Sequence, residues 1–390
     1  MNHARGMGKR ILRQKAGAAM RTTLMKISES ALYNNARVIR EHIPEKVGMM
    51  CVVKADAYGH NAVEAAKTML RAGADAFAVA IVDEAAQLRA AGISQPVLIL
   101  GGSDAASLRE AVALGVSQAV YDIAMLDVLQ GAAKELGRRA SAHLKIDTGM
   151  SRIGVRTEEQ LDELLAHWKK HCPDVSMDGI FTHFCVAESD EAFTCLQNER
   201  FARAVDRARA AGFRPVSHAA ATSAMLEGDF QYDMVRAGIG LYGTCVPQLA
   251  GQLQYAQTLT ARPVRIQTIQ AGESVGYGRT FTAQRETVVM TVPIGYGDGY
   301  PRILSNRACA LVEGRRAPVI GNVCMDMIML DVTGIPGAGM DSEVVLMGAQ
   351  GSERITPDEL AQHAQTIPYE IMLGFSPRVR RVYEKMENDA

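Results

Sequence analysis

The chain is 390 residues long, which is more than one ordinary domain holds, so two domains are expected. Hydrophobic residues make up 48% and charged residues 22% of the sequence, as in soluble globular proteins. The net charge of −1 would not attract nucleic acid or an anionic membrane surface, and the longest apolar runs, about ten residues, are too short to span a bilayer.

The seven cysteines are scattered along the chain and include no C-x-x-C pair. This pattern indicates neither a disulfide framework nor a zinc site, so we expect no metal and a cytoplasmic protein. Residues 1–21 are basic and lack the apolar segment of a secretion signal. We therefore expect them to form a disordered or flexible arm.

From about residue 25 to residue 245, short apolar runs alternate with helical patterns, which is typical of a parallel sheet. We predict strands at Met49–Val53, Ala76–Ile81, Pro96–Leu100, Ser117–Tyr121, His143–Ile146, Gly179–Thr182, Pro215–His218 and Met234–Ala237. Helical patterns occupy Ala62–Ala72, Val82–Ala91, Glu158–Lys170 and Glu199–Ala211. Glycines that should stop helices stand at Gly73, Gly92, Gly115 and Gly212. The pattern favours a (β/α)8 TIM-type barrel over residues 22–256, with a doubly wound open sheet as the alternative.

The pattern changes near Leu259, where turn-punctuated runs rich in Val, Ile and Thr begin. We predict strands within Thr260–Gln270, Thr287–Ile294, Ala308–Val312, Ala317–Ile320, Met327–Val332 and Glu343–Met347. A helical pattern returns only at Pro357–Thr366. The sequence therefore predicts a C-terminal mainly-β domain over residues 257–390.

Lys54 lies at the end of the first predicted barrel strand, inside Cys51-Val-Val-Lys54-Ala-Asp-Ala-Tyr-Gly-His60. A lysine at the tip of a buried strand is costly unless its charge is paired or its pKa falls. A lysine with a lowered pKa is a nucleophile that forms Schiff bases with carbonyl compounds. The alternative is a strand-end lysine whose amine simply reaches solvent.

Ionisable residues also end other predicted barrel strands, and catalytic groups of barrels come from these ends. They are Lys145 with Asp147, His183, His218 and Arg236. Any one of them could be an ordinary rim residue, but their recurrence at matching positions favours a site.

A glycine-rich segment, Arg236-Ala-Gly238-Ile239-Gly240, follows the last predicted barrel strand. It is no dinucleotide fingerprint, because that motif opens a helix in an early βαβ unit. Free backbone N–H groups after strands seven and eight of a barrel suit a phosphate, and the hydroxyls of Thr222 and Ser223 could assist. The alternative is that these glycines only make tight turns. A Schiff-base lysine together with a phosphate site suggests pyridoxal 5′-phosphate.

An arginine beside the pyridine nitrogen of that cofactor would weaken its capacity to accept electrons, because arginine does not give up its proton. A weak electron sink suits racemisation, which also needs a base on each face of Cα. Lys54 can serve one face, and Tyr277, between Gly276 and Gly278, is a candidate for the other. The alternative for Tyr277 is an ordinary turn tyrosine.

These motifs together resemble those of the alanine racemase family, the fold-type III pyridoxal-phosphate enzymes, from about residue 22 to residue 385. In chain order they are Val53-Lys54-Ala-Asp-Ala-Tyr58-Gly-His60, His143-Leu-Lys145-Ile-Asp-Thr-Gly-Met-Ser-Arg152, Val275-Gly-Tyr277-Gly278, Pro293-Ile-Gly-Tyr296-Gly-Asp-Gly-Tyr300, Cys324-Met325-Asp326 and Pro368-Tyr369-Glu370. Six motifs in the same order make the resemblance specific.

The resemblance implies a head-to-tail homodimer that interconverts L-alanine and D-alanine and supplies D-alanine for peptidoglycan. Each site would take Lys54 from one subunit, for the D-alanine face, and Tyr277 from the other, for the L-alanine face. Arg236 would face the pyridine nitrogen, and His183 would hold the catalytic tyrosine.

The remaining site residues are also implied by the resemblance. Arg152 matches an arginine near the cofactor's ring hydroxyl and the substrate carboxylate, which the backbone at Met325 would also hold. Lys145 matches a lysine that is carbamylated in some members. The implied phosphate ligands are Tyr58, Thr222 or Ser223, Gly238, Ile239 and Tyr369.

Some positions depart from the family pattern. Asp56 stands where Asn is usual, Glu188 where Asp is usual, and Asn322 where Arg is usual. The segment from His218 to Ser223 is one residue short in its spacing to Arg236, which leaves the phosphate hydroxyl open between Thr222 and Ser223. The missing cation at Asn322 could change substrate access or preference.

Three alternatives stay open. One is a racemase of serine or of a broader amino-acid range. Another is a non-catalytic pyridoxal-phosphate carrier, although a carrier needs no Tyr277. The third is a decarboxylase of the same fold type, which should have an acid where Arg236 stands and a reactive cysteine in the second domain, for which Cys309 and Cys324 are the candidates.

Overall fold

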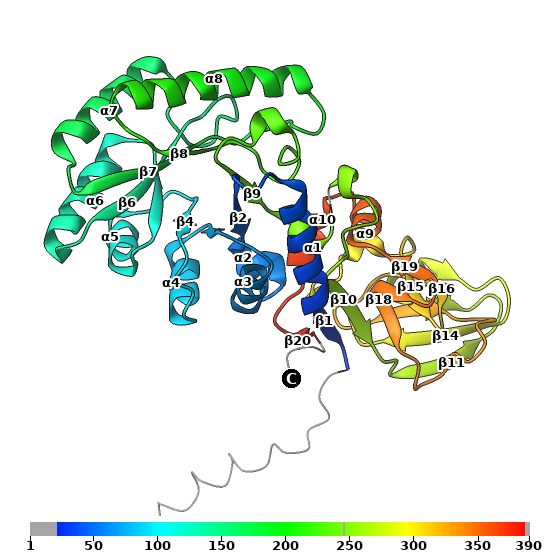
Figure 1. Ribbon diagram of the computed structural model, residues 1–390. Helices are drawn as coiled ribbons and strands as arrows, with labels where there is room; N and C mark the ends of the chain where they lie inside the picture. Colours follow the sequence, from blue (N-terminus) through cyan, green and yellow to red (C-terminus); the bar gives the residue numbers. More distant parts are fainter. Residues whose placement is uncertain (1–21, 245, 387–390) are drawn as a thin grey trace, which may run out of the picture. The chain divides into compact units, whose positions relative to one another are not determined.

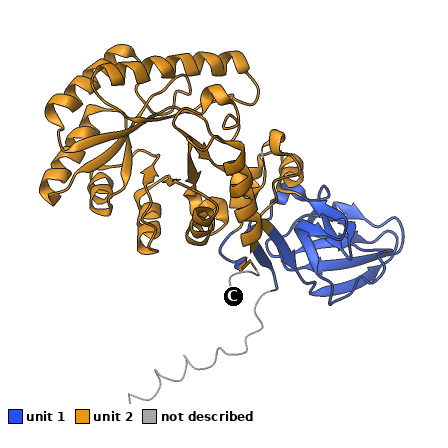
Figure 2. Ribbon diagram, viewed as in Figure 1, with its two compact units in different colours: residues 1–26, 258–355, 376–382 blue, residues 27–257, 356–375, 383–390 orange. Residues whose placement is uncertain are grey.

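The computed structural model describes residues 22–244 and 246–386 (Figure 1), so the predicted N-terminal arm lies outside the described residues. The chain forms two compact units (Figure 2). One comprises Ile27–Gln257, Thr356–Phe375 and the described residues from Tyr383 onward. The other comprises Thr258–Ile355, Ser376–Val382 and the described residues up to Lys26.

The first unit contains eight parallel strands in the order β8-β7-β6-β5-β4-β3-β2-β9. The strands are β2 (Gly48–Val52), β3 (Ala76–Val79), β4 (Val97–Ile99), β5 (Ser117–Val120), β6 (Ala140–Lys145), β7 (Val175–Phe181), β8 (Val216–His218) and β9 (Met234–Ala237). Each overlaps a strand predicted from the sequence, although β6 and β7 begin before the predicted His143 and Gly179. These runs were recognisable because strands of a parallel sheet are buried on both faces and therefore continuously apolar.

Helices flank the barrel strands on the outside (Figure 1). They are α1 (Glu29–His42), α3 (Ala62–Arg71), α4 (Val82–Ala90), α5 (Ala105–Leu114), α6 (Ile123–Leu136), α7 (Glu158–His171) and α8 (Glu191–Ala210), while the short α2 (Lys54–Gly59) follows the carboxyl end of β2. All four helix-stop glycines have positive φ, which confirms those predictions. Helix α8 begins eight residues earlier than predicted, because the carboxylate of Asp190 caps its N-terminus by accepting from the backbone N–H of Phe193.

The barrel is nearly closed between β8 and β9, which stand at the two ends of the strand order. Strand β9 pairs with β2 in parallel register, and an isolated bridge joins Ala221 to Arg236. Backbone bonds from Asp233 to Ser217 (3.0 Å) and from Arg236 to Ala220 (3.0 Å) connect β9 to β8 and the residues that follow it. The arrangement confirms the barrel and excludes the open sheet.

The second unit is rich in antiparallel strands. A seven-stranded sheet has the order β16-β15-β18-β10-β1-β20, with β19 also paired to β18, and a three-stranded sheet has the order β11-β14-β17. The strands are β1 (Leu24–Ser28), β10 (Gln257–Ala261), β11 (Arg265–Ile269), β12 (Ser274–Val275), β13 (Phe281–Thr282), β14 (Thr287–Val292), β15 (Cys309–Val312), β16 (Arg315–Pro318), β17 (Ile328–Asp331), β18 (Val344–Gln350), β19 (Glu353–Ile355) and β20 (Arg380–Glu384).

The helical segment near the C-terminus groups with the barrel. Helices α9 (Pro357–Ala364) and α10 (Pro368–Leu373) belong to the first unit, although the β-rich segment precedes them in the chain. The carboxylate of Asp358 accepts hydrogen bonds from Thr244 (2.7 Å) and Tyr255 (2.9 Å), which fixes α9 there. Among the described residues, no helix is long and apolar enough to cross a membrane.

Candidate active site

A cavity of about 600 Å³ opens at the carboxyl ends of the barrel strands. Its walls include Lys54, Tyr58, Lys145, Arg152, His183, Thr222, Ser223, Arg236, Gly238, Ile239 and Tyr369. Eleven site residues predicted from the sequence therefore line one cavity. The volume is within the range of small-molecule sites.

Lys54 follows β2 and opens α2 with an unusual backbone. Residues Ala55 to Tyr58 all have φ between 51° and 54°, a left-handed turn that is costly for residues other than glycine. Two carboxylates hold this turn. Glu84 accepts from the backbone N–H of Ala55 (2.6 Å), and Asp56 accepts from the N–H of Ala62 at the start of α3 (2.8 Å).

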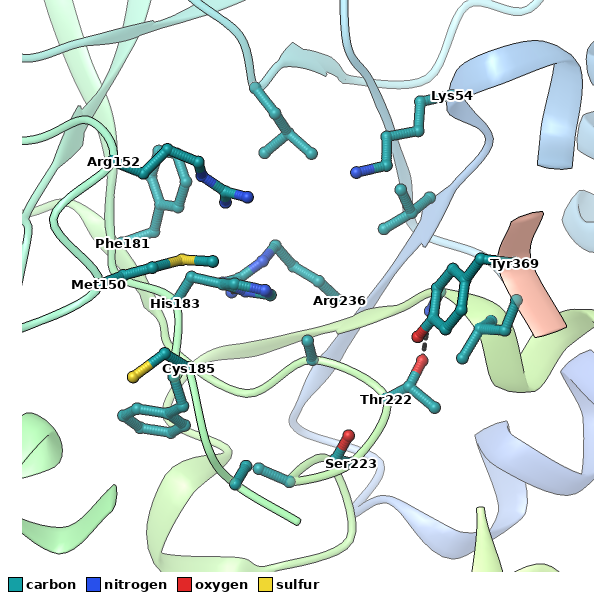
Figure 3. A pocket seen from close by; sticks show the side chains of 18 of the residues that line it. Lys54, Met150, Arg152, Phe181, His183, Cys185, Thr222, Ser223, Arg236 and Tyr369 are labelled. Atoms are coloured by element: carbon teal, nitrogen blue, oxygen red, sulfur yellow. Dashed lines mark hydrogen bonds between the residues drawn. The ribbon is translucent and has the colours of Figure 1, made fainter. Parts of the chain in front are cut away.

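The Lys54 amine faces a cationic part of the cavity. Figure 3 shows its nitrogen and the Arg152 guanidinium directed into the same space, with Arg236 and His183 nearby. Burial and then the charge of Arg152 lower the pKa of Lys54, against a smaller opposing effect of Glu84. A larger fraction of the amine is therefore neutral and nucleophilic than for an ordinary lysine.

Arg236 is buried in β9 and held by protein acceptors at both terminal nitrogens. Nη1 donates to the carbonyl (3.0 Å) and to Nδ1 (2.9 Å) of His218, while Nη2 donates to the carbonyls of Thr182 (2.8 Å) and Ala219 (2.8 Å). Nη2 also lies 3.3 Å from Nδ1 of His183. Burial lowers the Arg236 pKa to about 9, so the side chain stays a cation near neutral pH. Its Nε–H is the donor that the described residues leave for a ligand.

A chain of buried imidazoles supports Arg236 from behind. Because Nδ1 of His218 accepts from Arg236, its Nε2 carries the proton and donates to Nδ1 of His143 (2.9 Å). Burial and then Arg236 lower the pKa of His218, and burial lowers the pKa of His143 to about 4. Both rings are therefore neutral at neutral pH and can act as acceptors.

Burial, and then the charge of Arg236, lowers the pKa of two further groups. The pKa of His183 falls to about 3 and that of Lys145 to about 7. The Lys145 amine donates to the carbonyl of Ile146 (2.7 Å) and lies 5.3 Å from the ring centroid of Phe181. A neutral amine is the form that reacts with carbon dioxide, so this environment suits carbamylation.

The opposite end of the cavity gathers hydroxyls and backbone N–H groups. The Thr222 hydroxyl accepts from the N–H of Gly238 (2.9 Å), and a Cβ at Gly238 would stand 3.3 Å from that hydroxyl and 3.5 Å from the hydroxyl of Tyr58. Burial raises the Tyr58 pKa to about 12, which keeps its hydroxyl a donor. The Tyr369 ring lies 5.9 Å from that of Tyr58.

The two hydroxyls left open by the sequence have different surroundings. Thr222 is buried beside the Gly238 turn, whereas the Ser223 hydroxyl donates to the carboxylate of Glu188. The geometry favours Thr222 as the hydroxyl at the glycine turn. Glu188, one of the departures from the family pattern, has Ser223 as its partner.

Tyr277 and Met325 do not line this cavity. Both belong to the β-rich unit, where 74% of Tyr277 and 53% of Met325 are exposed. The amide of Asn322 donates to the carbonyl of Tyr277 (2.7 Å). The sequence-predicted residues therefore divide into a barrel group that shares one cavity and an exposed pair elsewhere.

Two residues that support the site were missed by the sequence reasoning. His143 could have been found, because it lies two positions before Lys145 and alternate residues of a strand share one face. Glu84 had no signal, since a glutamate in the first turn of a helix is ordinary. It contacts the lysine segment only because β3 and β2 are neighbours in the sheet.

The cavity fits pyridoxal phosphate in the chemistry of its groups. A lysine with a lowered pKa, a permanently cationic arginine and a glycine turn with hydroxyl donors stand around one space. A side chain at Gly238 would approach the hydroxyls of Thr222 and Tyr58, so glycine keeps the space between these groups open. The fold and this cavity are those of a two-domain β/α-barrel enzyme.

Comparison with known proteins places this enzyme in a family. Residues 27–246 match the family model "Alanine racemase, N-terminal domain", and residues 256–383 match "Alanine racemase, C-terminal domain". The alanine racemase of Citrifermentans bemidjiense is 41% identical over 376 residues, covering 93% of this chain and 99% of that protein. The chain belongs to the alanine racemase family and is a racemase that acts on an amino acid.

Solved structures agree with that assignment. The alanine racemase of Bacillus anthracis with bound L-Ala-P is 32% identical with a TM-score of 0.87, and covers 95% of this chain and 96% of that one. A histidine racemase from Leuconostoc mesenteroides subsp. sake is 29% identical with a TM-score of 0.84. The match covers 95% of this chain and 100% of that one. The same fold therefore carries racemases that are named for different amino acids.

Proposed function

We propose that the chain is a pyridoxal-phosphate-dependent alanine racemase of the cytoplasm that interconverts L-alanine and D-alanine and supplies D-alanine for peptidoglycan. The observation that carries the proposal is one cavity in which Lys54, with a lowered pKa, faces Arg152 and the buried cation Arg236. The 41% identical relative named alanine racemase supports alanine as the substrate.

Named side chains would hold the cofactor. Bound pyridoxal phosphate supplies an electron sink that acidifies the Cα proton of an attached amino acid. Lys54 would hold it covalently and Arg236 would donate from Nε to its ring nitrogen. Tyr58, Thr222, Tyr369 and the Gly238–Ile239 backbone would bind its phosphate, with Ser223 turned to Glu188 instead.

Two bases would move the Cα proton. The Lys54 amine takes or returns the proton on the D-alanine face, and Tyr277 of the partner subunit does so on the L-alanine face. His183 would orient that tyrosine. Arg152 and the backbone at Met325 of the partner subunit would hold the substrate carboxylate.

A head-to-tail homodimer would bring these groups together. Tyr277 and Met325 are large side chains with high exposure on the β-rich unit, which is unusual unless another surface covers them. A site shared between subunits would explain that exposure.

A second candidate is a racemase with a different or broader amino-acid range, such as one acting on serine. Two observations favour it. The family's usual Arg is Asn322 here, and a structure with the same fold and 29% identity is named a histidine racemase. The carrier and decarboxylase alternatives gain no support, since the chain matches racemases over both domains.

The test is exchange of Cα hydrogen in D2O, followed by NMR and chiral analysis. Purified protein with pyridoxal phosphate is incubated with L-alanine, L-serine and L-histidine in separate samples. We expect rapid exchange with formation of the D-isomer for alanine. Lys54→Ala should lower that rate at least about a hundredfold, because it removes both the cofactor lysine and a base.

The exposed Lys67, on α3, supplies the matched control, and Lys67→Ala should exchange alanine at the wild-type rate. Faster turnover of serine or histidine than of alanine would move the assignment to the second candidate. No exchange of any substrate by cofactor-loaded protein would contradict the proposed activity altogether.

A further inference from the structure

Helices α6 and α7, which are neighbours on the outside of the barrel (Figure 1), bring together three side chains that the racemase reaction does not use. Asp127 comes from α6, His167 from the last turns of α7, and Cys172 caps the C-terminus of α7. None of them lines the candidate active site.

The potential ligand atoms of these three residues converge. Nε2 of His167 lies 2.7 Å from Oδ1 of Asp127, and Sγ of Cys172 lies 3.9 Å from the same oxygen. One imidazole nitrogen, one thiol sulfur and one carboxylate oxygen all lie within 4.8 Å of one another.

The separations of the nitrogen and the sulfur from the Asp127 oxygen can be compared with those in a tetrahedral zinc site. Zinc bonds of about 2.0–2.1 Å to nitrogen or oxygen and about 2.3 Å to sulfur put neighbouring ligand atoms roughly 3.3–3.5 Å apart. The Asp127 carboxylate must therefore move closer to the Cys172 sulfur by a few tenths of an ångström, and His167 must move away from that carboxylate by somewhat more. Rotation of partly exposed side chains can supply both adjustments.

The three side chains of the cluster differ in their exposure to solvent. Cys172 is buried, the side chain of His167 is 22% exposed and that of Asp127 is 56% exposed. The sulfur is thus enclosed by the fold, while the other two ligand side chains are partly open to solvent. His171 stands one turn after His167, with the two ring centroids 4.8 Å apart, so this side of α7 carries a second imidazole.

We propose that Asp127, His167 and Cys172 form a structural binding site for a zinc-type divalent cation, with water or His171 as the fourth ligand. Imidazole, thiolate and carboxylate are the ligands that zinc takes in proteins. Binding forms a metal–sulfur bond and breaks the S–H bond of Cys172, whose proton leaves to solvent. No electron is transferred, because zinc has no redox chemistry here.

The site would join α6 to α7, which contact each other. A cation that binds the folded chain and not the unfolded one stabilises the fold in proportion to its free concentration. Bound cation should raise the stability of the folded protein. It should leave the rate of alanine racemisation unchanged, since none of the ligands lines the cavity. Failure of this proposal would therefore leave the proposed function intact.

The test uses tag-free, cofactor-loaded protein that has been stripped with a chelator and dialysed against zinc. Metal analysis should give about one zinc per chain, and zinc X-ray absorption should show one sulfur neighbour at about 2.3 Å beside nitrogen or oxygen neighbours at about 2.0–2.1 Å. Bound zinc should raise the unfolding temperature.

Substitutions of the proposed ligands distinguish zinc bound at this site from zinc bound adventitiously elsewhere. His167→Gln and Asp127→Ala change partly exposed side chains, so they should fold, and each should lower zinc affinity at least tenfold. Cys172→Ala should abolish the sulfur signal. The exposed Cys195 supplies the matched control, and Cys195→Ser should keep stoichiometry, affinity and the sulfur signal.

Two results would overturn the proposal. One is the absence of stoichiometric zinc from the folded wild-type protein. The other is zinc that binds without a sulfur neighbour, or that binds equally to His167→Gln and to wild type. Either would leave the cluster as a hydrogen-bonded His167–Asp127 pair beside a buried thiol.

Discussion

At the residue scale, Asn322 is the departure from the family pattern with the clearest structural consequence. Tyr277 stands between two glycines with positive φ, at 69° for Gly276 and 73° for Gly278. Such a turn is held by few local interactions, and the Asn322 amide supplies one by donating to the Tyr277 carbonyl (2.7 Å). The residue that replaces an arginine therefore positions the proposed second base.

Replacing this amide should weaken catalysis through the position of Tyr277. Loss of one hydrogen bond is worth about 0.5–1.5 kcal/mol, so Asn322→Ala should lower kcat for L-alanine roughly twofold to tenfold. The KM should change little, because Arg152 on the barrel is untouched. Steady-state kinetics in both reaction directions would measure the changes in kcat and in KM separately.

A matched control is Asn198→Ala, which removes a hydrogen bond from the Tyr232 hydroxyl in the barrel unit. Its kcat should stay at the wild-type value. An Asn322→Ala enzyme with unchanged kcat, or with only a raised KM, would contradict a positioning role for Asn322.

At the scale of elements, strand pairing explains a glycine that the sequence pattern does not. In the parallel pair β6–β7, His143 stands opposite Gly179. A Cβ at Gly179 would lie 2.2 Å from Nδ1 and 2.4 Å from Cε1 of the His143 ring. Only glycine therefore leaves room for the imidazole that supports His218 and, through it, Arg236.

Gly179→Ala should consequently destabilise the protein by about 1–3 kcal/mol, the usual cost of forcing atoms into a packed core. Gly131→Ala is the matched control, since Gly131 lies inside α6 and a Cβ there would meet nothing within 4 Å. It should stabilise by about 0.4–1 kcal/mol. Urea unfolding of both holoenzyme variants would measure these differences, and equal effects of the two substitutions would refute the packing argument.

The barrel strands could be predicted from the sequence, but the contacts that hold the site residues in place were harder to predict. Continuous apolar runs marked β2 and β9, and the ends of those strands located Lys54 and Arg236. The left-handed turn after Lys54 was not predictable, because Ala and Tyr have no preference for positive φ. It is maintained by Glu84 of α4 and by the bond from Ala62 of α3 to Asp56 in the turn, and sequence spacing does not reveal such contacts between elements.

At the scale of the whole molecule, each compact unit is built from segments that are separated in the sequence. Residues 356–375 return to the barrel unit after the β-rich segment and contribute Tyr369 to the cavity wall. The sequence showed the change of pattern near Leu259, and the family resemblance implied Tyr369 as a phosphate ligand, but the helical pattern at Pro357–Thr366 was assigned to the C-terminal domain. Likewise, scattered cysteines concealed the cluster at Cys172, whose partner Asp127 lies on another helix.

The central claim is a site shared between two subunits, with Lys54 from one and Tyr277 from the other. The most direct test mixes two inactive variants, Lys54→Ala and Tyr277→Phe, under conditions that exchange subunits. A heterodimer would contain one site with both native residues, so random mixing should restore roughly a quarter of wild-type alanine racemisation. Mixtures that stay as inactive as the separate variants, although subunit exchange is demonstrated, would contradict the shared site.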